Sequence, residues 1–251
     1  MDLEWKNNID WKVHTLNKKI YLMRDHNWAF AAWEIAKLEG EIRDKSLVVH
    51  VDSHFDDVTD GLSVKGLHDA KTIEEIISVS RSFDRSLGQI PPSNIMHIDN
   101  FIWASVGRGT VEEVIHVSKD NQELNTLSDL EWYYVDKLPK DCNYRTKLFK
   151  NCDAFFEEFS QVRFSEFVGD RTVILDFDID TFNQLDSTIR SDLVPESEVR
   201  LCVQKLLDLY PWDLITIAIS PDYCGGTEEA AYLLNIVLDE FNLRIEDMVL
   251  W

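Results

Sequence analysis

The sequence is poor in the residues that mark flexible or disulfide-bonded chains. Of 251 residues, 9 are glycine, 6 are proline and 4 are cysteine. The sequence contains no glycine- or serine-rich linker and no internal repeat, which argues against separate modules and predicts a single domain over residues 1–251. The cysteines form no Cys-x-x-Cys pair, which is typical of a reduced cytosolic protein. A link between Cys142 and Cys152 is the alternative.

Long apolar runs and basic residues are also scarce. No stretch approaches the roughly 20 apolar residues that cross a membrane, and the first residues are acidic and aromatic, unlike a signal peptide. We therefore expect a cytoplasmic protein that binds no membrane. Its 25 basic against 46 acidic residues give a net charge of -21, which disfavours nucleic acid as a partner and favours a cationic substrate. Ordinary solubility is the alternative reason for this acidity.

Apolar runs typical of strands alternate along the chain with helical patterns. Hydrophobic residues make up 45% of the sequence, which is enough for a large core. Strands are predicted at 20–23, 47–51, 114–117, 132–135, 173–175 and 214–219, and helices at 28–38, 72–79, 199–209 and 228–241. This alternation predicts an α/β fold with a mostly parallel sheet that is covered on both faces.

Two clusters of acidic residues directly follow predicted strands. Asp52-x-His54-x-Asp56 follows the strand at 47–51, and Asp176, Asp178 and Asp180 follow the strand at 173–175. Ligands of such sheets bind beyond the carboxyl ends of the strands, so both clusters point to one edge. Buried carboxylates are costly without cations, and two divalent metals would offset that cost. A polar turn and a solvated edge strand are the alternatives.

His26 follows the first predicted strand and is a third candidate at this edge, although a histidine there can also be structural. The predicted metal ligands are His26, Asp52, His54, Asp56, Asp178 and Asp180. Four carboxylates balance two divalent ions, and the excess of oxygen donors without cysteine favours manganese over structural zinc. Two adjacent metals can hold a bridging water, lower its pKa and aim it at an electrophilic carbon or phosphorus. The pattern therefore predicts a hydrolase.

The order and spacing of these motifs resemble the metal motifs of the arginase and deacetylase-like ureohydrolase superfamily. The three are His26 after an aspartate, Asp52-x-His54-x-Asp56 and Phe177-Asp178-Ile179-Asp180, and residues 97–102 add likeness to the branch that includes peptide arginases. The resemblance implies a three-layer αβα fold, two Mn²⁺ ions and a bridging hydroxide that attacks a guanidinium carbon. Asp56 counts among the catalytic residues as well as the ligands.

The resemblance also suggests residues outside the metal set. His68 stands where arginases have a proton-shuttling histidine, although an exposed loop histidine is the alternative. Arginases grip the guanidinium with the glutamate of a Glu-x-Asn-Pro pattern, but residues 218–221 read Ala-Ile-Ser-Pro here. Asp222 could supply the missing carboxylate or be a turn residue. Asn100 lies among apolar neighbours and could contact the substrate backbone or begin a helix.

These observations predict a manganese hydrolase that converts arginine in a precursor peptide to ornithine and urea. An amide hydrolase that acts on an acylated amine is the nearest alternative. A non-catalytic acidic protein that binds a basic peptide and keeps metal for stability is another. The sequence has neither a glycine-rich phosphate loop nor a Gly-x-Ser-x-Gly elbow, so nucleotide-dependent and serine-hydrolase activities have no support.

Overall fold

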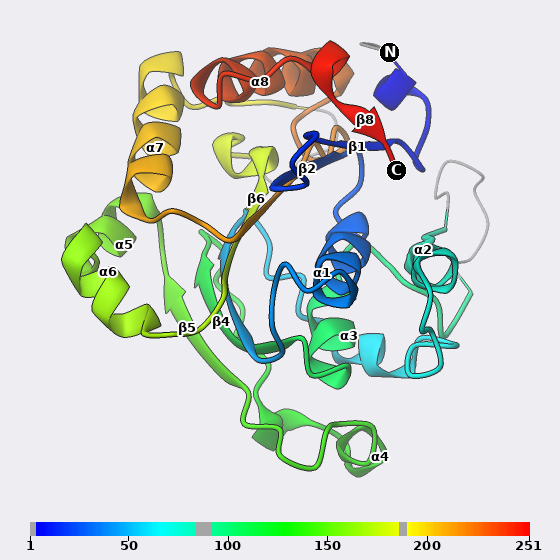
Figure 1. Cartoon of the computed structure of the whole chain (residues 1–251). Coiled ribbons are helices and arrows are strands. Elements are labelled where there is room, and N and C mark those ends of the chain that lie inside the picture. Colours follow the sequence, from blue (N-terminus) through cyan, green and yellow to red (C-terminus); the bar gives the residue numbers. More distant parts are fainter. Residues whose placement is uncertain (1–3, 84–91, 186–189) are drawn as a thin grey trace.

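The computed structural model describes residues 4–83, 92–185 and 190–251. Within these residues one eight-stranded sheet has the order β5-β4-β3-β6-β7-β2-β1-β8 (Figure 1). Neighbours from β5 to β2 pair in parallel, whereas β1 pairs antiparallel with both β2 and β8. The strands are β1 Lys12–His14, β2 Ile20–Met23, β3 Ser46–Val51, β4 Val111–Val117, β5 Arg145–Phe149, β6 Val173–Asp178, β7 Leu214–Ala218 and β8 Val249–Leu250.

Helices cover both faces of the sheet and make three layers. One face carries α1 Trp28–Leu38, α2 Ile73–Ser80 and α3 Phe101–Gly107, and the other carries α5 Cys152–Glu158, α6 Gln161–Val168, α7 Glu196–Leu209 and α8 Thr227–Glu240. Short 3-10 helices are η1 Glu4–Lys6, η2 Thr59–Ser63, η4 Leu127–Asp129, η5 Ile179–Phe182 and η6 Ile245–Asp247. Among the described helices, none combines the length and the apolarity that a membrane span requires.

The central strands are buried on both sides because their side chains alternate between two hydrophobic cores. In β3, Leu47 and Val49 pack with α5 to α8, and Val48 packs with α1 to α3. In β6, Val173 and Leu175 face the first core and Ile174 the second. Alternation with period two thus accounts for continuously apolar runs. The predicted three-layer αβα fold with a mostly parallel sheet is confirmed.

The strand predicted at 132–135 is wrong, because these residues form the short helix α4, Trp132–Val135. The segment lies away from the sheet (Figure 1), and its side chains are largely exposed, with Trp132 at 76%. Aromatic and β-branched residues favour a strand only where neighbouring strands and a core pack against them. Four residues are also too few to show a helical period. The sequence patterns did not predict the edge strand β5. Its first residues are polar and partly exposed, so they lack the apolar pattern of a strand.

Candidate metal centre

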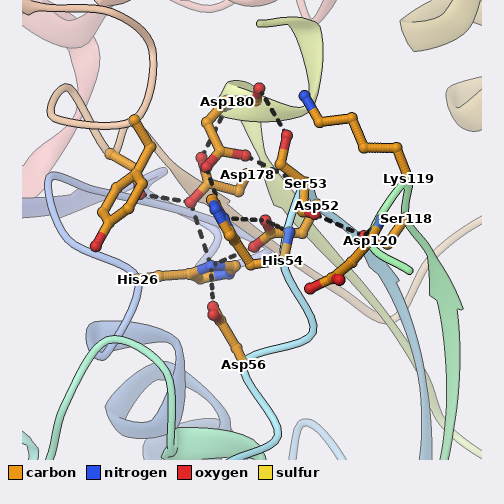
Figure 2. Close-up of polar contacts among 12 residues, drawn as sticks. His26, Asp52, Ser53, His54, Asp56, Ser118, Lys119, Asp120, Asp178 and Asp180 are labelled. Atoms are coloured by element: carbon orange, nitrogen blue, oxygen red, sulfur yellow. Dashed lines mark hydrogen bonds and ion pairs between the residues drawn. The ribbon is translucent and has the colours of Figure 1, made fainter. Parts of the chain in front are cut away.

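The predicted ligands lie where adjacent parallel strands end. Asp52 directly follows β3, and Asp178 is the last residue of β6. Val51 pairs with Phe177 across β3 and β6, and the ends of β6 and β2 both pair with Ala218 of β7. The segment after β2 therefore brings His26 to the same edge. Figure 2 shows the side chains converging from these segments.

A first group of donors surrounds Nδ1 of His26. This atom lies 3.0 Å from Oδ2 of Asp52, 2.9 Å from Oδ2 of Asp56 and 3.2 Å from Oδ2 of Asp178. Nδ1 is buried and makes no hydrogen bond within the described residues. A nitrogen atom and three carboxylate oxygens thus face one point from different segments.

A second group forms around Nδ1 of His54. It lies 3.1 Å from Oδ2 of Asp180 and 3.3 Å from Oδ1 of Asp52. Asp52 therefore belongs to both groups, with Oδ2 directed to His26 and Oδ1 directed to His54. A carboxylate that divides its oxygens between two donor groups is suited to bridge two metal ions.

The donor set fits hard divalent cations. Five of the six side chains are buried, and His54 is 30% exposed. Nε2 of His26 lies 3.0 Å from Oδ2 of Asp176, which accepts hydrogen bonds, so the proton of His26 is on Nε2. Nδ1 is then the nitrogen that faces Asp52, Asp56 and Asp178, whose carboxylate charges repel one another. A cation between them removes this repulsion, and oxygen and imidazole donors suit manganese, magnesium or zinc in a catalytic setting.

The pKa values show the same excess of negative charge. Burial, followed by the neighbouring charge of Asp52, raises the pKa of Asp56 to about 7. The pKa of Asp180 is raised well above its usual range by burial and then by Asp178 and Asp52. Burial alone would raise the pKa of Asp52, but its contacts with His26 and His54 hold it well below the usual value. Without a cation, the buried group resists full ionisation.

Asp176 is hydrogen-bonded to His26, on the side of the imidazole ring opposite Nδ1. Its Oδ2 accepts hydrogen bonds from His26 Nε2 at 3.0 Å and His50 Nδ1 at 2.7 Å, and its Oδ1 accepts one from Thr216 Oγ1 at 2.6 Å. Trp33 Nε1 donates in turn to Thr216 Oγ1 at 3.2 Å. Such contacts set the tautomer and the direction of a metal-binding histidine. The sequence pattern placed Asp176 in the acid cluster without a role, and nothing in it pointed to His50.

The backbone is strained where it positions two site residues. Asp56 has φ of 50° and Ser220 has φ of 41°, both in the left-handed region that is costly for residues other than glycine. Ser220 Oγ donates to Oδ2 of Asp178. On the other side, the backbone N–H of Ser53 donates to Oδ1 of Asp180 at 3.2 Å, and the hydroxyl of Ser53 donates to the backbone carbonyl of Asp180 at 3.1 Å. These contacts hold both carboxylates of the late motif in place.

A cavity of about 210 Å³ opens over the two groups. Besides the ligands it is lined by Asp57, Asp99 and Asp120, and no lysine or arginine contributes to its wall among the described residues. A neighbouring cavity of about 300 Å³ shares Ile98, Ser220 and Tyr223 with the first.

Arg24, Asp25 and Asp222 line this second cavity. Burial, only partly offset by Arg24, raises the pKa of Asp25 to about 6, and Asp222 contributes to this rise. The predicted residue Asp222 thus lies beside the metal cavity and not among the residues that line it.

The structure does not place His68 among the residues that line the metal cavity, so it gives the proton-shuttle prediction no support. His68 is exposed, and its Cε1 lies 3.6 Å from where a Cβ on Gly107 would be. Gly107 precedes β4, so this contact is at the amino ends of the parallel strands, opposite the metal edge. The pKa of His68 is lowered by partial burial and by the charge of Arg108. The alternative, a loop histidine, describes it.

Asn100 has a structural role in the described residues, and its predicted contact with substrate stays a prediction. It is buried at the start of α3, where its Oδ1 accepts from the N–H of His97 at 2.9 Å. Its Nδ2 donates to Asp60 at 2.9 Å and to the carbonyl of Ile95 at 3.3 Å. The expectation that a buried Asn100 needs polar partners is confirmed, and those partners come from the protein.

Comparisons with known proteins yield similar solved structures but no sequence match. No family model and no curated protein matches the chain. Proclavaminate amidino hydrolase from Streptomyces clavuligerus has a TM-score of 0.47 and 16% identity, over 89% of this chain and 64% of its own. A hypothetical agmatinase from Burkholderia thailandensis has a TM-score of 0.46 and 12% identity, and the alignment covers 88% of this chain and 56% of that protein.

An arginase from Bacillus cereus has a TM-score of 0.42 and 14% identity, over 90% of this chain and 71% of its own. The chain thus spans less than two thirds of the first two structures. Likenesses this weak decide neither activity nor substrate. The fold and the site themselves define an α/β protein with a candidate binuclear metal centre.

Proposed function

We propose that this protein is a binuclear metal hydrolase that cleaves the guanidinium of arginine in a peptide, giving ornithine and urea, with Mn²⁺ as the metal. The observation that supports this most is the position of Asp52, whose two oxygens face two separate donor groups. One group comprises His26, Asp56 and Asp178, and the other comprises His54 and Asp180.

The donor groups would hold the two ions, which, when bound, supply a water of lowered pKa between them. Asp176 holds the ring of His26 so that Nδ1 would be available as a ligand to the first ion. Ser220 and Ser53 fix the carboxylates of Asp178 and Asp180 through hydrogen bonds. The ligand positions are therefore set by the fold before any metal arrives, which favours an ordered site.

The charge of the cavity supports a cationic substrate. Two divalent ions offset the four ligand carboxylates, which leaves Asp57, Asp99 and Asp120 on the wall without a lysine or arginine among the described lining residues. A guanidinium group would be attracted to this wall, and an anion would be repelled. Their negative charge would serve where the sequence lacks the glutamate of the arginase pattern.

The second cavity supports a peptide over a free amino acid. It adjoins the metal cavity, with which it shares the lining residues Ile98, Ser220 and Tyr223. An arginine side chain in the metal cavity would place its backbone and a neighbouring residue toward Asp25 and Asp222. Arg24 already pairs with Asp25, so the exposed Asp222 is the carboxylate available to a substrate ammonium or backbone N–H.

The test is urea release and peptide mass after incubating Mn²⁺-loaded protein with arginine peptides, free arginine and acetyl-lysine peptides. We expect urea and the mass shift from arginine to ornithine with peptides, and neither product from Asp178→Asn. The matched control Asp170→Asn changes an exposed aspartate outside both cavities and should remain active. If protein with two bound metals leaves every substrate intact, the proposed reaction is wrong.

One observation favours a second candidate, hydrolysis of an amide in an acylated amine. The resemblance expects a guanidinium-binding glutamate in the segment 218–221, which has no acidic residue here. Ser220 of this segment is neutral, lines the metal cavity and donates a hydrogen bond from its hydroxyl to Asp178. Release of acetate from the acetyl-lysine peptides without urea would select this reaction.

A further inference from the structure

A pair of cysteines outside the metal centre joins two helices on one face of the sheet. Cys152 is the first residue of α5, and Cys202 lies within α7. Their Sγ atoms are 2.8 Å apart, and Cys202 donates its thiol proton to Cys152. The cross-link considered from the sequence, Cys142 to Cys152, does not occur, because Cys142 packs against the core on the opposite face.

We propose that Cys152 and Cys202 form a reversible disulfide that cross-links α5 and α7. A disulfide has an S–S length near 2.05 Å, so the sulfur atoms need to approach by only about 0.8 Å from their present separation. The two helices are neighbours, since Lys205 of α7 reaches Asp153 of α5 at 3.7 Å. The movement of the two sulfur atoms that the bond requires is therefore short.

An oxidant can reach the pair. Both residues are partly exposed and line a cavity of about 360 Å³ together with Lys119, Lys150 and Lys205. The thiolate is the reactive form of a cysteine. The hydrogen bond to Cys152, followed by burial, raises the pKa of Cys202 well above its usual value, so Cys202 keeps its proton and Cys152 is the sulfur atom that attacks.

With hydrogen peroxide as the oxidant, the Cys152 thiolate attacks one oxygen, the O–O bond breaks, and a sulfenic acid and hydroxide form. Cys202 then attacks the sulfenic sulfur as its proton leaves, the S–O bond breaks, and a second hydroxide departs. Protons from the two thiols convert both hydroxides to water. The cysteines lose two electrons in total and the peroxide gains two, and a dithiol reverses the change by exchange.

Residues near this cysteine pair make hydrogen bonds to segments that carry the predicted metal ligands. The same cavity is lined by Ser118, whose hydroxyl donates to the carbonyl of Ser53 at 2.8 Å. Lys119 donates to the carbonyl of Asn183, three residues beyond Asp180. The disulfide would thus stiffen a region on which ligand-bearing segments rest, but its formation does not depend on the proposed hydrolase activity.

The experiment treats the full chain with stoichiometric hydrogen peroxide and then counts thiols and maps peptides by mass spectrometry. We expect free thiols to fall from four to two, a mass loss of about 2 Da, and a Cys152–Cys202 cross-linked peptide that dithiothreitol removes. The cross-link closes a loop of 50 residues, so the melting temperature should rise by roughly 5 to 10 °C.

Cys202→Ser should lose the cross-linked peptide and the rise in melting temperature, while the control Cys142→Ser keeps both. Each variant is checked for native circular dichroism before oxidation, and Cys152→Ser provides a second independent test. Retention of four thiols by the wild type, sulfinic acid at Cys152 without a cross-link, or a bridge to a different cysteine would each overturn the proposal.

Discussion

Nε2 of His26 lies 3.0 Å from Oδ2 of Asp176, a residue 150 positions away in the chain, and this contact leaves Nδ1 of His26 facing three carboxylates. The orientation of the His26 ring therefore depends on β6, the strand that carries Asp176, although His26 itself follows β2. Predictions about the site follow from this arrangement.

Removal of Asp176 should weaken metal binding without removing a ligand. Asp176→Asn keeps the size of the side chain but no longer fixes the proton of His26 on Nε2, and loss of such a contact typically lowers metal affinity by about 10- to 100-fold. Mn²⁺ titration calorimetry measures this loss. If the effect is only structural, the melting temperature of the metal-free variant should fall while its metal affinity stays that of the wild type.

Loss of a ligand should have a larger effect. Asp178→Asn removes a charged oxygen from the group around His26, so we expect fewer than two metals per chain and loss of hydrolysis. Metal content is measured by elemental analysis, and turnover by product release. The exposed Asp170→Asn serves as control. Two metals and full turnover in Asp178→Asn would contradict the assignment.

Metal binding should stabilise the fold. Manganese at about 100 times its dissociation constant should add about 2.7 kcal/mol to the free energy of unfolding, or roughly 5 to 10 °C in melting temperature. Chelation by EDTA should reverse the shift, and His54→Asn, which impairs the second group, should reduce it. An equal shift in Asp178→Asn would mean that the ion binds elsewhere.

Charge in the second cavity should affect substrate binding more than catalysis. Asp222→Asn should raise KM for a peptide with a basic residue beside the arginine by about threefold, with kcat unchanged, because the residue is exposed and its interaction is screened. For free arginine the variant should match the wild type. A change in kcat with both substrates would place Asp222 at the reaction itself.

His116 should contribute to loss of stability in acid. It is fully buried in β4, and neither of its ring nitrogens has a hydrogen-bond partner among the residues that the structure describes. Burial, followed by the charge of His50, holds its pKa well below the usual 6.5, despite nearby Asp52 and Asp176. Unfolding therefore takes up a proton below pH about 6.5, and stability is lost as the pH falls.

His116→Leu removes this proton uptake. Between pH 7.5 and 5.5, the wild type should lose about 1.4 kcal/mol more of its unfolding free energy than the variant. Urea unfolding at each pH, with the metal content held constant, measures the difference. Parallel pH profiles for the two proteins would show that His116 is not the source.

The amino-acid sequence by itself determined the elements that rest on short-range patterns. Helix α1 occupies the predicted residues 28–38, and β2 occupies 20–23, because the periodicity of apolar residues reports directly which side of an element is buried. The convergence of Asp52, His54 and Asp56 on one edge could be predicted as well, since alternate residues after a strand stay within one side chain's reach of each other.

Only the tertiary structure decided what contacts what across the sheet. The strand order β3-β6-β7-β2 brings His26 onto Asp176, and the path of the chain before α3 and β4 leaves His68 at the opposite edge. Cys152 faces Cys202 and not Cys142 for the same reason. These contacts between distant residues depend on how the helices pack over the two faces of the sheet. That packing is a balance of many long-range contacts, and the local periodicity of the sequence does not report it.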